Sequence, residues 1–421
     1  MRIFRDVFER PVANAAPTGA ASILLPPPTS TIHSLVHPPH IKAEHKATAQ
    51  LDDYPLGNTS PSFYLGQLQR SVGSCGLVNF DERSMWSHEL LAGVSFRFGE
   101  ATGKQDADGA FGGVPTVNFF GDLGQLPAGG SAGLHVAPKD DAGPIERGGY
   151  TLYRSFSHAV VLSETKRQGP EEAPFLARLL RLRRGLATQE DWLAMLARLE
   201  SRLTPAQRTA FETVRLPDGS TRAPRVLTLF ETWKGANRHN RQALRELGMP
   251  VACIPAVMVA GRPPKGEEKE VGQLPEVATM AAGMRVILTR NQGGGKLVRY
   301  GLNNGAMGRV VATLFARGAA PPAFPEAVVV DFPSYTGPAW IAAHPTWVPV
   351  PVQTSKDMES GAIRTGIPLK PGYAVVIHKS QGISIGDFKP AERMRLELGV
   401  GRAHSNSWRR SLALAAVPAR P

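Results

Sequence analysis

Two short apolar segments, each followed at once by polar residues, constrain this chain more than any other feature. Residues 77–80 read Leu-Val-Asn-Phe and lead into Asp81 and Glu82, while residues 116–120 lead into Gly-Asp-Leu-Gly-Gln at 121–125. Apolar runs of this length between turn signals are typical of strands buried in a parallel sheet. Parallel sheets bind ligands at the carboxyl ends of their strands, so we expect these polar residues to share one edge.

The polar residues at these strand ends are suited to phosphate chemistry. Asp81 is expected to hold Mg²⁺ through water, and Glu82 to orient or deprotonate an attacking water. Gln125 is expected to sense a terminal phosphate. Two plainer interpretations stay open: Asp81 and Glu82 as a surface acidic pair, and Gln125 as a residue that caps a turn before Pro127.

Further segments occur in the order found in one group of DNA helicases. Together they resemble superfamily 1B helicases of the petite-integration-frequency (Pif) and RecD-like group, over about residues 12–385. The matching segments are 16–21 followed by 31–34 (motif Ia), 81–85 (motif II), 121–127 (motif III), 162–168 (motif IV), Leu229-Phe230 with Asn240, 301–308 (Gly-Leu-Asn-Asn-Gly-Ala-Met-Gly) and 378–382 (motif V).

The resemblance implies a site for ATP and Mg²⁺. It places Asp81, Glu82 and Gln125 at the nucleotide, with Asp81 next to the metal. It also implies that Arg167 acts as an arginine finger, which neutralises charge on the γ-phosphate. The alternative is that Lys166 and Arg167 form an ordinary basic turn.

The resemblance also implies contacts to single-stranded or forked DNA. Such contacts come from donors that touch the sugar–phosphate backbone without reading sequence. The expected residues are Pro17, Thr18, Gly19, His33, His378, Lys379, Ser380 and Gln381. Two alternatives remain open: His33 as a core histidine, and 378–381 as a plain loop.

One motif of the group is missing from the sequence. A phosphate-binding loop has the pattern GxxxxGK[ST], but Gly103-Lys104 is followed by Gln105, and Gly295-Lys296 by Leu297. We therefore expect that the chain starts just after such a loop. Residues 387–421 also show nothing like the group's final arginine element, so the ATP site is expected to be incomplete.

The expected fold class is α/β, with two RecA-like P-loop NTPase motor domains built on parallel sheets. The first domain is expected at 1–148 and the second at 149–275 with 366–400, interrupted by a β-rich insertion at 276–365 and followed by a divergent, disordered tail at 401–421. A strand is expected at 159–162. The apolar run 251–261 is too short to cross a bilayer and is expected to be buried.

Composition agrees with a polyanionic partner. The 421 residues carry a formal net charge of +12, which favours nucleic acid, although a GC-rich genome would also raise the arginine content. Cys75 and Cys253 are too few for a disulfide framework or a zinc site. We expect an intracellular protein, in the nucleus or the mitochondrion if it is eukaryotic.

Two functions follow from these observations. The first is an ATP-dependent DNA helicase that moves on single-stranded DNA and unwinds duplexes, with this chain as a fragment that lacks the phosphate loop. The second is a catalytically inactive, helicase-like protein that binds single-stranded DNA. A coding sequence for GxxxxGK[ST] in frame upstream of Met1 would favour the first.

Overall fold

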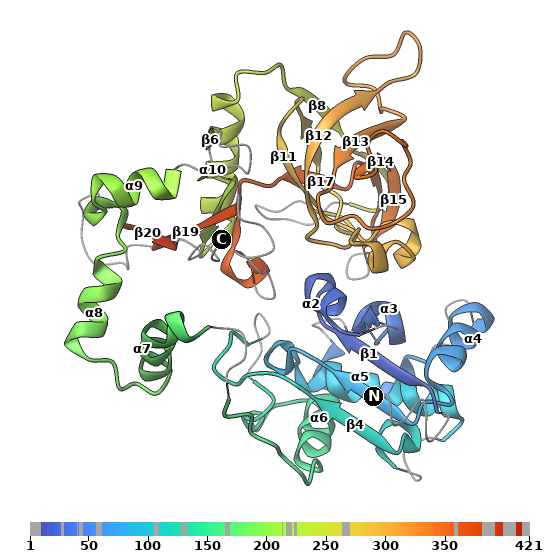
Figure 1. The fold of residues 1–421 in the computed structure, drawn as a ribbon. Helices are drawn as coiled ribbons and strands as arrows, with labels where there is room; N and C mark the ends of the chain where they lie inside the picture. The colour runs from blue at the N-terminus through green and yellow to red at the C-terminus, as the bar shows by residue number, and fades with distance from the viewer. Residues whose placement is uncertain are drawn as a thin grey trace. The chain divides into compact units, whose positions relative to one another are not determined.

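The structure is a computed structural model, and it divides into two compact units. It describes residues 10–26, 29–39, 41, 45–55, 61–104, 109–127, 133–164, 169–212, 214–215, 221–222, 225–262, 270–357, 361–380, 392–398 and 410–414. The first unit comprises Met1–Ala159, Ala252–Gly283 and Ile287–Lys370, and the second comprises Val160–Val251, Met284–Val286 and Pro371–Pro421 (Figure 1). The β-rich segment is thus grouped with the amino-terminal part, and the expected domain limits remain a prediction.

A parallel sheet forms the centre of the amino-terminal part of the first unit. Its strands lie in the order β2-β1-β3-β4, and every neighbouring pair is parallel. Their bounds are Thr29–Thr31 (β2), Val12–Ala16 (β1), Leu77–Phe80 (β3) and Thr116–Phe119 (β4). The α/β fold with parallel sheets is as expected, and β3 and β4 both end at the predicted polar residues.

One face of this sheet carries the hydrophobic core. Because side chains alternate across a strand, Ala13, Ala15, Val78 and Phe80 point to the same face, where they pack in one buried cluster. The Phe80 ring lies 4.9 Å from the Trp86 ring, centroid to centroid. Burial of the larger side chains, Val78 and Phe80, stabilises the fold by about 1.5–3 kcal/mol each. The helices of this part are α2 (Gly19–Leu24), α3 (Ile32–Val36), α4 (Pro61–Val72), α5 (His88–Thr102) and α6 (Pro144–Arg154).

Three asparagines form a ladder on the opposite face. Asn14, Asn79 and Asn118 are in register across β1, β3 and β4. The Asn79 amide donates to Asn14 Oδ1 at 2.8 Å, and the Asn118 amide donates to Asn79 Oδ1 at 3.1 Å. Asn79 is therefore no defect in an apolar strand, because its polar atoms are paired within the sheet.

The β-rich segment of the chain forms three sheets. The two-stranded sheet pairs β10 (Val277–Met280) with β8 (Ala252–Pro255). The five-stranded sheet has the order β14 (Trp347–Pro351), β13 (Ala327–Asp331), β12 (Met307–Leu314), β11 (Arg285–Leu288) and β17 (Leu369–Pro371). The three-stranded sheet has the order β15 (Gln353–Lys356), β16 (Ile363–Gly366) and β9 (Val257–Ala260).

The second unit has its own sheet, in the order β18-β7-β19-β20. Strands β18 (Ala374–Val376) and β19 (Glu392–Leu398) both run parallel to β7 (Arg225–Phe230), and β20 (Arg410–Leu414) is antiparallel to β19. Its other elements are α7 (Ala173–Arg183), α8 (Gln189–Leu196), α9 (Pro205–Glu212), α10 (Trp233–Glu246), β5 (Val214–Arg215) and β6 (Thr221–Arg222).

One expectation about apolar runs is wrong, and a second is only partly right, because the run 251–261 forms strands in which Ile254 is buried while other residues are exposed. Residues 159–162 form no strand although all of them are described, and Val160, Val161 and Leu162 are 85–88% exposed. The run 251–261 forms two strands, β8 and β9, but Val257 and Val259 are 53% and 59% exposed rather than buried. In both cases the apolar pattern indicates a preference for a buried strand, but burial also requires another element to cover the segment.

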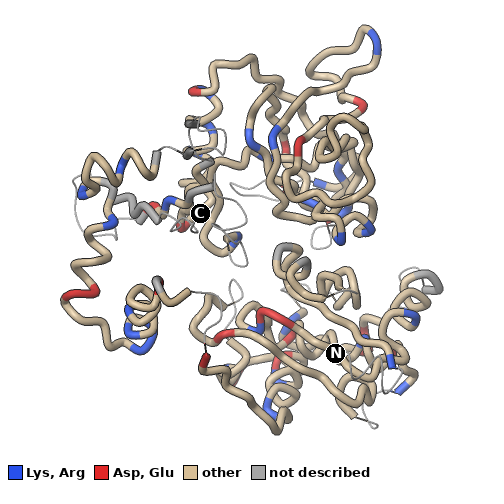
Figure 2. The backbone as a smooth tube through the Cα atoms, in the orientation of Figure 1, with Lys and Arg blue, Asp and Glu red and all other residues tan. Residues whose placement is uncertain are grey.

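No helix in the described part of the chain is both long and apolar enough to span a membrane. Lys and Arg are spread over many elements of both units, with several of them on and just after α7 (Figure 2).

Candidate functional site

The end of β3 holds the carboxylate pair in a fixed turn. The backbone N–H of Asp81 donates to the Ala15 carbonyl at 2.9 Å, which extends the pairing of β1 and β3 by one residue. The Asp81 carboxylate accepts the N–H of Glu82 at 2.8 Å. Glu82 itself adopts a left-handed backbone (φ 52°), a conformation that costs a residue with a side chain free energy and is concentrated at functional turns. Asp81 and Glu82 are both half-buried.

The ends of β3 and β4 are bonded to each other. The N–H of Arg83 donates to the Phe120 carbonyl at 2.9 Å. Gly121 follows with φ 151°, and a Cβ atom placed on it would lie 2.5 Å from the backbone nitrogen of Arg83. Only glycine allows both this conformation and this approach. The structure thus brings the loop that carries Asp81 and Glu82 into contact with the loop that carries Gln125.

A short turn presents Gln125. The Asp122 side chain accepts the N–H of Gly124 at 2.8 Å, and the Asp122 carbonyl accepts the N–H of Gln125 at 3.2 Å. Gln125 is exposed. The glutamine therefore lies in a turn at the carboxyl edge of the sheet, in agreement with the predicted position, and the sensor role remains a prediction.

The end of β1 carries the first predicted DNA contacts. Thr18 caps α2, because its hydroxyl accepts the N–H of Ala21 at 3.2 Å. Gly19 lies against the turn at 301–308, since a Cβ atom on it would meet the Asn303 side chain at 2.5 Å. His33, on α3, is exposed, which excludes the alternative of a core histidine.

An arginine next to the carboxylates was not anticipated. Arg83 Nη1 donates to the Tyr153 hydroxyl at 3.4 Å, while its buried Nε has no hydrogen-bond partner in the part of the chain that is described. Burying a cationic donor without a hydrogen-bond partner costs free energy, unless an anion accepts a hydrogen bond from it. Its position directly after Glu82 is the signal in the sequence that could have identified it.

The described residues contain no group of three or more His, Cys, Asp or Glu side chains that could hold a metal ion. Asp81 and Glu82 supply oxygen ligands of the kind that Mg²⁺ prefers. Phosphate oxygens and water would have to complete the coordination, as is usual for Mg²⁺ bound with a nucleotide. The site therefore fits a metal that arrives with its phosphates, and Arg83 Nε fits an anionic ligand.

The second unit holds a separate group of predicted residues. His378 and Lys379, in the short helical turn Ile377–Ser380 after β18, are exposed, and Ser380 Oγ donates to the Ile377 carbonyl at 2.7 Å. Arg167 and Gln381 lie outside the described residues.

Asn240, on α10, holds the strand that leads to this group. Its Oδ1 accepts the N–H groups of Tyr373 at 3.0 Å and Ala374 at 2.8 Å, and its Nδ2 donates to the Ala374 carbonyl at 3.0 Å. The neighbouring strand β7 bonds Tyr373 through the N–H of Thr228, so the N–H and C=O of Ala374 face away from β7. The Asn240 amide therefore takes the place of one peptide group of a further strand.

Solved structures of DNA helicases share this fold. A structure titled as two coordinating Pif1 helicases at forked double-stranded DNA matches with a TM-score of 0.58 and 19% identity, covering 91% of this chain and 76% of that chain. The Pif1 helicase of Candida albicans matches with 0.58 and 18%, covering 91% and 79%. A Bacteroides Pif1 helicase, solved with ADP-AlF3 and single-stranded DNA, matches with 0.57 and 19%, covering 89% and 75%. At this identity the likeness shows the fold alone. Neither a protein-family model nor a curated protein matches the sequence.

Proposed function

We propose that this chain binds single-stranded DNA as part of an ATP-dependent DNA helicase. One observation carries the proposal. The carboxylates after β3 and the Gly-Asp-x-x-Gln loop after β4 lie at one sheet edge, where the Arg83–Phe120 hydrogen bond joins them. The residues after β1 belong to the same edge, because β1 and β3 are parallel neighbours.

The roles of the residues follow from their chemistry. Asp81 holds Mg²⁺ through water, and Glu82 accepts a proton from the attacking water. Gln125 senses the terminal phosphate, while Arg83 supplies positive charge beside the carboxylates. A bound nucleotide with its metal supplies the phosphoryl group, and the chain positions that group and the water.

The solved relatives support this proposal. The Bacteroides Pif1 helicase was crystallised with ADP-AlF3 and single-stranded DNA, and another neighbour is titled as a structural basis for DNA unwinding at forked double-stranded DNA. We propose the same classes of ligand for this chain: ATP with Mg²⁺, and single-stranded or forked DNA.

A second function is favoured by one observation. The sequence contains no GxxxxGK[ST], so it supplies no backbone cradle and no lysine for the β- and γ-phosphates. A polypeptide of this sequence is therefore proposed to bind single-stranded DNA while hydrolysing ATP at a rate far below the value of about 10 s⁻¹ that is common among enzymes.

The test combines DNA binding with ATP hydrolysis. We expect a labelled single-stranded oligonucleotide to bind independently of its sequence, with a log–log salt slope of about −0.7 per phosphate neutralised. His33→Ala should weaken binding about threefold to tenfold, the loss expected for one hydrogen bond. His135→Ala, another exposed histidine in the same unit, is the control.

Hydrolysis separates the two functions. In a protein that carries a GxxxxGK[ST] loop ahead of this chain, DNA-stimulated ATPase activity that disappears in Glu82→Gln supports the helicase, because the amide keeps the shape of the side chain but accepts no proton. Binding without hydrolysis supports the inactive DNA-binding protein. Absence of binding to single-stranded DNA would contradict both.

A further inference from the structure

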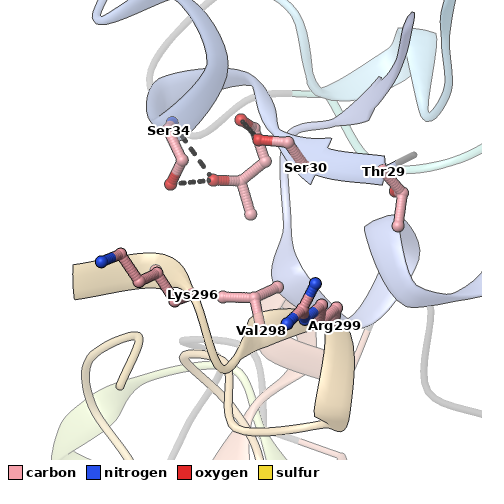
Figure 3. A pocket seen from close by; sticks show the side chains of 8 residues that line it. Thr29, Ser30, Ser34, Lys296, Val298 and Arg299 are labelled. Atoms are coloured by element: carbon pink, nitrogen blue, oxygen red, sulfur yellow. Dashed lines mark hydrogen bonds between the residues drawn. The ribbon is translucent and has the colours of Figure 1, made fainter. Parts of the chain in front are cut away.

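A pocket of about 380 Å³ lies beside the residues that follow β1. One side consists of residues with hydroxyl groups, Thr29, Ser30, Thr31 and Ser34, and the other of Gly295, Lys296, Val298 and Arg299 (Figure 3). None of its lining residues is acidic. Sites for small ligands usually have volumes of about 300–1,000 Å³, so a phosphate with its sugar can be accommodated.

The hydroxyl side is ordered by its own hydrogen bonds. The Thr31 hydroxyl accepts the N–H of Ser34 at 3.3 Å and donates to Ser34 Oγ at 2.8 Å. Since Ser34 Oγ accepts this bond, its own proton is left to donate. In the sheet, Thr31 is the partner of Ala16, the last residue of β1. The hydroxyls therefore lie next to Pro17, Thr18 and Gly19, the first predicted DNA contacts.

The opposite side carries two cations on a built turn. Gly293, Gly294 and Gly295 all have positive φ angles (60°, 62° and 90°), and a Cβ atom on Gly294 or Gly295 would meet nothing within 4 Å. These two glycines are thus required by backbone conformation and not by lack of space. Gln292, which is buried, anchors the turn, because its N–H donates to the Leu302 carbonyl at 3.0 Å.

Lys296 and Arg299 follow this turn, and both are exposed. Neither forms a salt bridge with an acidic residue in the described part of the chain, while the Arg299 guanidinium lies 4.6 Å from the Tyr300 ring centroid. The sequence around Lys296 departs from a phosphate-binding loop only because Leu297 replaces Ser or Thr and Arg290 replaces the first glycine. Thr29, Ser30 and Thr31 donate their hydroxyl protons within the protein. Two cations opposite the Ser34 hydroxyl are therefore the donors that this pocket offers to a phosphodiester.

We propose that this pocket binds a backbone phosphate of single-stranded nucleic acid, with Lys296 and Arg299 neutralising its charge and Ser34 donating to an oxygen. The inference rests on the proposed DNA binding and extends it from β1 across β2 to the β-rich part of the first unit. The free phosphate groups of ATP offer the same chemistry, so the experiment includes both sources.

The first measurement compares two double variants that remove the same charge. Lys296→Gln with Arg299→Gln alters the pocket. Lys356→Gln with Arg317→Gln, at two exposed positions outside its lining, is the control. At about 0.1 M salt we expect the pocket variant to bind an oligothymidylate on the order of tenfold more weakly than the control, the loss of about one charged hydrogen bond. Its salt slope should be shallower by about 0.7, one phosphate.

The second measurement locates the phosphate. A single neutral methylphosphonate linkage is moved along the oligonucleotide. It should weaken binding to the unaltered protein at one position more than at the others, and this difference should vanish in the pocket variant. Lys296→Arg should keep most of the affinity, because it preserves the charge, and the midpoint of thermal unfolding checks that each variant is folded.

The outcomes are distinct. If the pocket variant binds the oligonucleotide as the control does, the inference is wrong while the proposed function stands. If the pocket variant instead loses affinity only for ATP or inorganic phosphate, the pocket serves a free phosphate and the inference is also wrong. If the unaltered protein binds no oligonucleotide, the proposed function fails, and the inference fails with it.

Discussion

In both units asparagine amides hold a strand that leads to candidate site residues, but they bond to different partners. In the first unit Asn14, Asn79 and Asn118 bond to one another across three strands that the backbone already pairs. In the second unit the single amide of Asn240 bonds to the backbone of β18, at the outer edge of its sheet. The ladder adds to an existing sheet, whereas Asn240 substitutes for a strand that the described sheet does not have.

The two candidate sites therefore differ in how far their backbone depends on one side chain. The carboxylates after β3 are also fixed by backbone bonds to Ala15 and Phe120. Among the described contacts, the N–H and C=O of buried Ala374 and the N–H of half-buried Tyr373 bond to Asn240 alone. We therefore expect the second unit to be the more sensitive to loss of its amide.

The largest effect is expected for Asn240→Ala. It leaves the N–H and C=O of Ala374 and the N–H of Tyr373 without their partner, and Ala374 is only 1% exposed. At about 1–3 kcal/mol for each unsatisfied buried group, the free energy of unfolding should fall by about 3–5 kcal/mol. Urea denaturation measures this. Asn237→Ala, half-buried on the same helix, should change it by less than about 1 kcal/mol. Equal effects of the two substitutions would show that Asn240 has no special role.

A smaller effect is expected for Asn79→Ala, in the middle of the ladder. It leaves Asn14 Oδ1 and the Asn118 amide without their bonds, so we expect a loss of about 2–3 kcal/mol. Asn118→Ala removes only the end of the ladder, where the side chain is half-buried, and should cost about 1 kcal/mol. If the end position proved more costly than the middle one, the ladder would not be a connected unit.

The sequence predicts the strands of both sites better than it predicts what supports them. The apolar run before Asp81 gives β3 with its observed limits, because burial on both faces leaves a clear pattern. Asn79 stands out in that run as an anomaly. Its partners are 65 and 39 residues away in sequence, so only the register of the sheet can reveal the ladder.

Other parts of the site depend on contacts that no local pattern contains. The resemblance to helicases identifies Asn240 but not its bonds to Tyr373 and Ala374, which are 133 and 134 residues away. Gly295-Lys296 fails as a phosphate-binding loop in sequence, yet the fold places Lys296 opposite the hydroxyls of 29–34. The local spacing of apolar residues predicts helices and strands. The side chains that surround a site residue depend on contacts between elements that are distant in sequence.

The smallest expected effect is on the reactivity of the Cys75 thiol, and it tests whether the two units open independently. Burial raises the pKa of its thiol to about 11, and Sγ donates to the Ser71 carbonyl at 3.3 Å. At pH 8 we therefore expect a thiol reagent to modify exposed Cys253 rapidly and Cys75 only when the first unit opens. Asn79→Ala should accelerate modification of Cys75, and Asn240→Ala should not if the units open separately. Mass spectrometry of the labelled peptides measures both rates.

The same thiol gives a pH dependence with a definite sign. Because its pKa is higher in the folded protein than the ordinary value of 9.0, folding favours the neutral thiol. The stability that the neutral Cys75 thiol contributes is fully present below about pH 9 and is lost as the pH rises through about 11. Cys75→Ala should make the free energy of unfolding flatter across this range, and an unchanged slope would contradict the assignment.

The close approach of Gly121 to Arg83 has a consequence for how this protein can vary. The atom that a side chain at 121 would strike is a backbone nitrogen, which every amino acid possesses. No replacement at position 83 can make room for it, whereas position 83 itself can change without disturbing the neighbouring loop's backbone. A library randomised at both positions should therefore recover glycine at 121 in nearly every folded clone, whatever accompanies it. The contact between the two loops is made by backbone atoms and does not depend on which side chain is present at position 83.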